Sequence, residues 1–136
     1  IFEKIKKRSQ EVNQLQPGLE PALQVWGAVQ SLPESGLAIV NVGKRDISYD
    51  VELPVPEMFF RPEKDRRPQK MPEGCQVTVL HDQHANITLP AVPGLQIGDL
   101  ISFGVSHPCT TFDKWRLMYL LDDDYDITGG IRVYMS

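Results

Sequence analysis

Prolines and glycines divide the sequence into short apolar runs, and this spacing limits the fold more than any other feature. The chain of 136 residues contains eleven prolines and ten glycines. The runs between them are rich in β-formers and predict strands. They lie at 22–32, 36–43 and 46–54, twice within 75–89 on either side of 81–85, and at 98–105, 115–123 and 127–135. We therefore expect a mainly β fold, a small closed or nearly closed barrel.

Two segments fall outside this strand pattern. Phe2 to Leu15 has apolar residues at helical spacing and ends at Pro17-Gly18, which predicts a short N-terminal helix. The segment 54–72 combines prolines with interleaved charges of both signs, so we expect a solvated surface loop there. The chain starts at Ile1 inside the amphipathic segment, and we expect it to be part of a longer polypeptide.

Charge and cysteine content exclude several classes of protein. The formal net charge is −4, whereas a nucleic-acid-binding domain needs a basic surface. No apolar run is long enough for a membrane span, and no signal peptide is visible. The two cysteines, Cys75 and Cys109, are too few for a disulfide scaffold and predict free thiols in a cytoplasmic protein.

His107-Pro108-Cys109 is the strongest candidate site. A residue before proline is driven into an extended conformation, and in an extended chain residues two apart project to the same side. The His107 imidazole and the Cys109 thiol would then share one space and offer a nitrogen and a sulfur ligand to zinc. Two ligands leave coordination positions open for water or substrate. The alternative is a turn histidine beside a cysteine that packs as a small apolar residue.

Two further segments concentrate polar chemistry. In the first, strand alternation sets Asp82 and His84 on one face and His81 on the other, so that a nearby carboxylate could fix a histidine tautomer. The second follows Gly43 and is either a solvated turn or a network of salt bridges. Its charged residues are Lys44, Arg45, Asp46 and Asp50.

Four stretches resemble one family of enzymes. They are GKRDISYD (43–50), DQHA (82–85), LQIGDLISFGVSHPCTTFDKW (95–115) and DDDYDITGGIRVYM (122–135). They are similar to the C-terminal domain of the D-serine dehydratase and D-threonine aldolase group, fold-type III pyridoxal-phosphate enzymes related to alanine racemase. The likeness is greatest to bacterial D-serine or amino-acid deaminases. It implies that 19–136 is the C-terminal β domain and that 1–18 is linked to, or left from, a missing N-terminal (β/α)8 barrel.

The resemblance also implies roles for individual residues. His107 and Cys109 match the family's metal ligands, for Zn2+ or another divalent cation, and His84 matches a catalytic histidine. Pyridoxal 5'-phosphate would be bound by the missing barrel, with no cofactor-binding residue in this part of the chain. Five residues are candidates for supporting contacts around the metal: Asp46, Asp82, Thr110, Thr111 and Asp113.

The implied reaction converts D-serine or a related β-hydroxy D-amino acid into a keto acid and ammonia. The metal would act on the leaving hydroxyl, and pyridoxal phosphate would stabilise the carbanion at Cα. We expect a homodimer in the cytoplasm, and no activity from this chain without its barrel. One alternative is a D-threonine aldolase that cleaves the Cα–Cβ bond. Another, of a different class, is a non-catalytic dimerisation or ligand-binding β domain.

Overall fold

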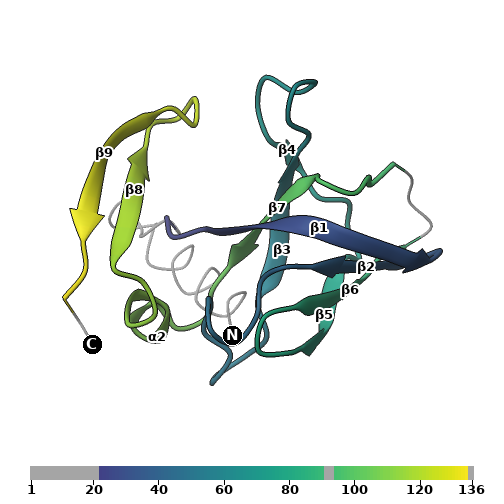
Figure 1. Ribbon diagram of the computed structural model, residues 1–136, viewed down its shortest axis with the longest axis horizontal. Helices are drawn as coiled ribbons and strands as arrows, with labels where there is room; N and C mark the ends of the chain where they lie inside the picture. Colours follow the sequence, from purple (N-terminus) through teal and green to yellow (C-terminus); the bar gives the residue numbers. More distant parts are fainter. Residues whose placement is uncertain (1–21, 91–93, 135–136) are drawn as a thin grey trace, which may run out of the picture.

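Seven antiparallel strands form one curled sheet (Figure 1) in the computed structural model, which describes residues 22–90 and 94–134. They are β1 (Val25–Glu34), β2 (Leu37–Val40), β3 (Val55–Phe60), β4 (Gln69–Lys70), β5 (Gln76–Leu80), β6 (Ala85–Thr88) and β7 (Leu100–Gly104). Their order is β4-β3-β7-β1-β2-β6-β5. Because β3 also contacts β5 at the far end of this order, the sheet curls towards closure. The expected mainly β, nearly closed barrel is confirmed.

The core consists mainly of branched apolar side chains from the strands of the sheet, with a few from the segments between them. In β1, Val25 and Val29 are buried at alternate positions, as the pleat of a strand requires. In β7, Ile101 and Phe103 are fully buried, and each contributes about 1.5–3 kcal/mol by leaving water. A Cβ at Gly27 would overlap side chains in the core, so a larger residue there would force the sheet apart.

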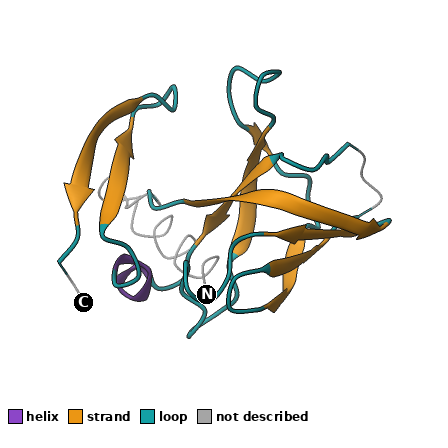
Figure 2. Ribbon diagram, viewed as in Figure 1, coloured by secondary structure: helices purple, strands orange, loops and turns teal. Residues whose placement is uncertain are grey.

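A separate two-stranded hairpin follows the sheet (Figure 2). It consists of β8 (Leu117–Leu121) and β9 (Ile127–Arg132), and the short helix α2 (Pro108–Phe112) precedes it. The hairpin exposes many large apolar side chains: Leu117, Tyr119, Leu120, Leu121, Ile127 and Ile131. A two-stranded hairpin is only marginally stable in water by itself, and burial of this apolar surface would add to its stability.

The predicted strand at 46–54 is wrong. These residues form turns and bends within a segment, residues 41–54, that we call the bridging loop. Its main-chain N–H groups bond to side chains: Ser48 N donates to Thr111 Oγ1 (2.9 Å) and Glu52 N to Ser106 Oγ (3.2 Å). Because side chains rather than a paired strand accept these bonds, the apolar alternation does not produce a pleat.

The predicted loop at 54–72 is also only partly correct, since it contains β3 and β4. The proline-rich sequence obscures β3. Pro56 lies at a shift in the register between β3 and β7, where a residue without an N–H is tolerated.

The predicted helix at Phe2–Leu15 lies outside the described residues. Within 22–90 and 94–134, no helix has the length and apolarity needed to cross a membrane.

Candidate metal and substrate site

His107 is held in place by a carboxylate from the bridging loop. It is the residue just before α2, with an extended backbone (φ −137°, ψ 87°), as expected for a residue before proline. Its Nδ1 lies 2.6 Å from Oδ2 of Asp50. An ionised carboxylate can only accept hydrogen bonds, so Nδ1 carries the proton. The other ring nitrogen, Nε2, has no hydrogen-bond partner within the described part of the chain.

Asp50 uses both of its carboxylate oxygens. While Oδ2 contacts His107, Oδ1 accepts a hydrogen bond from the Thr110 hydroxyl at 3.1 Å. The Thr110 hydroxyl is also 3.1 Å from the main-chain oxygen of His107. The hydrogen bond from His107, helped by the one from Thr110, lowers the pKa of Asp50, against a smaller opposing effect of desolvation. Asp50 is therefore ionised at neutral pH.

Cys109 lies in the first turn of α2 and is exposed. The predicted extended geometry holds at His107 but is wrong beyond it, because the helix begins at Pro108. Proline restricts the residue before it and is favoured at the first helical position, so it starts a helix here. Among the described residues, no group of three or more His, Cys, Asp or Glu side chains could hold a metal. His107 and Cys109 therefore amount to a two-ligand donor set at most.

The other predicted supporting residues mainly hold the bridging loop. Asp46 accepts a hydrogen bond from Gly43 N with its carboxylate (3.0 Å) and one from the Trp115 indole with its main-chain oxygen (2.7 Å). Thr111 is fully buried and bonds to Ser48 N. Asp113 is exposed at the end of α2. Of these supporting residues, Thr110 is the one that contacts the Asp50–His107 pair.

His84 lies in the turn between β5 and β6, where its Nε2 is 2.9 Å from Oε1 of Gln30 in β1. With His81 and Asp82 it lines a shallow hollow that does not include His107. The start of the bridging loop packs on this turn, since Lys44 N donates to His81 O (2.8 Å) and Arg45 N to Asp82 O (3.1 Å). The same loop thus contacts both histidine-bearing segments, one at each end.

Gly43 makes this contact possible. A Cβ at Gly43 would collide with the main chain of Asp82 and Gln83, which cannot move aside as a flexible side chain would. The glycine in the GKRDISYD motif therefore serves a close approach of two backbones. This requirement links the motif at 43–50 to the DQHA motif at 82–85, which the sequence shows only as separate stretches.

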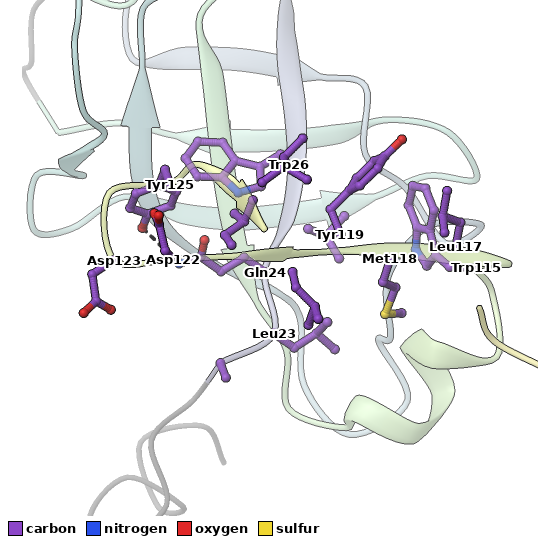
Figure 3. A pocket seen from close by; sticks show the side chains of 15 residues that line it. Leu23, Gln24, Trp26, Trp115, Leu117, Met118, Tyr119, Asp122, Asp123 and Tyr125 are labelled. Atoms are coloured by element: carbon purple, nitrogen blue, oxygen red, sulfur yellow. Dashed lines mark hydrogen bonds between the residues drawn. The ribbon is translucent and has the colours of Figure 1, made fainter. Parts of the chain in front are cut away.

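An apolar groove of about 760 Å³ separates the start of β1 from the hairpin (Figure 3). Leu23 and Trp26 line it from the start of β1 and the residues just before that strand, and Met118 and Tyr119 line it from β8. Trp26 meets the ring of Tyr125 edge to face, with centroids 6.0 Å apart. The groove was not predicted from the sequence, because its walls come from opposite ends of the described chain.

The family model described as "Putative serine dehydratase domain" matches residues 22–121, well over half of the chain. The chain therefore belongs to this family, and the resemblance drawn from the four motifs is confirmed. The matched region includes His84, the bridging loop and His107-Pro108-Cys109. Among curated proteins, none matches the sequence.

Solved structures of two enzymes have a similar fold. D-threonine aldolase from Filomicrobium marinum has a TM-score of 0.63 and 24% identity, covering 82% of this chain and 28% of its own. D-threo-3-hydroxyaspartate dehydratase from Delftia sp. HT23 has a TM-score of 0.60 and 17% identity, covering 83% and 32%. A cysteine-to-alanine mutant of that dehydratase, described as the metal-free form, has a TM-score of 0.60 and 16% identity, with the same coverage. The chain thus spans about a third or less of each relative.

Proposed function

We propose that this chain is the metal-binding C-terminal domain of a pyridoxal-phosphate-dependent D-amino-acid lyase. The favoured reaction converts D-serine, or a related β-hydroxy D-amino acid, into a keto acid and ammonia. The observation that carries the proposal is the His107 ring, whose Nδ1 is occupied by Asp50 and whose Nε2 remains available next to a cysteine in the same motif. Family membership supports the class of enzyme.

The donor set fits a catalytic metal better than a structural one. Imidazole nitrogen and thiolate sulfur suit Zn2+, and structural zinc sites are normally closed by four protein ligands. His107 and Cys109 would hold the metal, and open positions would remain for water and the substrate's oxygens. The cysteine-to-alanine change in the metal-free relative is in keeping with a cysteine ligand in this fold.

The chain's own residues would supply binding and proton transfer. When bound, the metal would draw electron density from the departing hydroxyl, while pyridoxal phosphate held by the other domain would stabilise negative charge at Cα. His84 is the proposed acid/base group. Since its Nε2 contacts Gln30, its Nδ1 is the nitrogen left to accept or donate a proton. Asp82 is exposed beside it.

The rest of the enzyme would be an N-terminal (β/α)8 barrel that carries pyridoxal phosphate, with 1–18 as its end or linker and 19–136 as the β domain. The apolar β8–β9 hairpin supports a docking role, because its side chains would be buried against the barrel or against the second subunit of a homodimer.

A cytoplasmic location is in keeping with Cys75 and Cys109, which are both free thiols.

D-threonine aldolase activity is the second candidate, favoured by the likeness to the aldolase from Filomicrobium marinum. The same metal position would then polarise the substrate hydroxyl before Cα–Cβ cleavage. The products separate the two reactions. A dehydratase releases a keto acid and ammonia from a β-hydroxy D-amino acid, whereas an aldolase releases glycine and an aldehyde.

The decisive experiment is Cys109→Ala in the full-length enzyme. We expect loss of bound metal and of most turnover, with the absorbance of the pyridoxal cofactor unchanged. Cys75→Ala is the matched control, since Cys75 packs against the core and burial raises the pKa of its thiol. If Cys109→Ala keeps wild-type turnover after chelation, this function is refuted and a non-catalytic β domain becomes the better description.

A further inference from the structure

We propose that Asp50 is a positioning residue that fixes the orientation of the metal ligand His107, and that Thr110 in turn fixes Asp50. The inference rests on the proposed metal-binding function and extends it to a residue of the bridging loop. Asp50 would not touch metal or substrate. It would act through the imidazole, by keeping the proton on Nδ1 and the lone pair of Nε2 directed at the metal.

The contact geometry supports this role. The 2.6 Å separation between Nδ1 and Oδ2 is short for a hydrogen bond of this type, as expected when the acceptor is charged. A histidine that binds metal through one nitrogen commonly donates its other N–H to a carboxylate, which fixes the ring and raises its basicity. Asp50 occupies the second position of that arrangement.

Asp50 is itself held from several directions. Thr110 lies one helical turn after His107, so both partners of the carboxylate come from the same end of α2. Two residues before Asp50, Ser48 N is anchored to Thr111, and two residues after it, Glu52 N is anchored to Ser106. The carboxylate is therefore positioned by the fold and does not depend on its contact with His107 alone.

Stability alone is a weak reason for this pair. The side chains of His107 and Asp50 are 38% and 44% exposed, and even a fully charged pair with that degree of exposure contributes little to folding. The Ser48, Glu52 and Trp115 contacts already fasten the bridging loop to the α2 segment. A carboxylate that is precisely placed yet adds little stability is better explained by its effect on the histidine.

The test measures Zn2+ affinity of the full-length enzyme by competition with a chelator. We expect Asp50→Ala to weaken binding by about 10- to 100-fold, with Asp50→Asn and Thr110→Val giving smaller losses. Asp123→Ala is the matched control, because it removes an exposed carboxylate from the hairpin turn, outside the residues proposed to support the metal. Its affinity should stay close to that of the wild type.

A second measurement reports the imidazole directly. In the metal-free enzyme with 15N-labelled histidine, the His107 signal should indicate a proton on Nδ1, and Asp50→Ala should shift the tautomer towards Nε2. A residue that tethers the loop through contacts other than this hydrogen bond would not change the signal. Should Asp50→Ala fail to fold, Thr110→Val still tests the idea through the same two measurements.

The outcomes separate this inference from the proposed function. If His107→Ala and Cys109→Ala abolish Zn2+ binding while Asp50→Ala and Thr110→Val retain wild-type affinity, the positioning role is wrong and the metal site stands. If the wild type, His107→Ala and Cys109→Ala all bind Zn2+ equally, both proposals fall together. Loss of affinity in Asp50→Ala with the predicted change of tautomer supports both.

Discussion

The main-chain N–H of Ser48 donates a buried hydrogen bond to the hydroxyl of Thr111, 2.9 Å away and 63 positions further along the chain. Both residues are almost completely inaccessible to water. The bond fastens the middle of the bridging loop to α2. It is therefore a buried anchor between the loop that carries Asp50 and the segment that carries His107, beside the Glu52 and Trp115 contacts.

Replacing Thr111 by valine should release this anchor. The side chain keeps its volume, but Ser48 N loses its acceptor, and an unpaired buried donor costs about 1–3 kcal/mol. Hydrogen exchange in the full-length protein should become faster at residues 46–52. Thr111→Ser is the control, because it keeps the hydroxyl and should retain most of the protection. Equal exchange in the valine and serine variants would show that the hydroxyl does not hold the loop.

A second prediction concerns Asp99, which is buried and receives hydrogen bonds from Arg61 Nε (2.9 Å), Arg61 Nη2 (3.0 Å) and Gln96 N (2.8 Å). Burial alone would raise the pKa of Asp99, but the hydrogen bonds and the charge of Arg61 outweigh burial and lower it. The carboxyl therefore binds a proton more readily in the unfolded chain. Its contribution to stability is complete above the unfolded pKa of about 3.9 and disappears as the pH falls through the lower folded value.

The measurement is the free energy of unfolding of the wild type and of Asp99→Asn between about pH 3 and about pH 6. The variant should be less stable near pH 6, and the difference should shrink as the pH falls. Asp123→Asn, which changes an exposed carboxylate at the hairpin turn, should follow the wild-type curve. A constant difference between wild type and Asp99→Asn over the whole range would rule out a lowered pKa as the source of the effect.

The sequence predicted those parts of the structure that depend on local pattern. The strand signals around β1, β2 and β7 reflect the alternation or continuity of apolar residues, and the structure has strands there. The prediction failed at 46–54, where side chains from 106–115 replace a strand as hydrogen-bond partners. Apolar alternation cannot reveal this, because the partners are set by the tertiary fold.

The candidate site divides in the same way. His107 and Cys109 can be selected from sequence because their chemistry and spacing are local. Asp50 was noted only as one charge in the segment after Gly43, since its partner lies 57 positions away. The single usable signal was its place at the end of the GKRDISYD motif. The start of α2 at Pro108 is not evident from sequence, because proline both holds the residue before it out of the helical region and favours the first position of a helix.

The hairpin gives the last prediction. Ile127 is 65% exposed and lines the groove beside Trp26, whereas Ile97 is 69% exposed in the turn before β7. If the groove and the hairpin dock against the rest of the enzyme, Ile127 is buried in the assembled protein and Ile97 is not. Ile127→Ser should then destabilise the full-length enzyme by about 1.5–3 kcal/mol, the value for exposing a buried apolar side chain.

Ile97→Ser is the matched control, with the same chemical change at a similar exposure in this domain. Substitutions at such surface positions stay within about 0.5 kcal/mol. Thermal unfolding of the two full-length variants provides the comparison, and sedimentation shows whether loss of the contact also dissociates subunits. A larger loss in Ile127→Ser with intact subunits indicates docking on the barrel of the same chain, while dissociation indicates the partner subunit. Equal stability of the two variants would mean that the hairpin remains in contact with water in the complete enzyme.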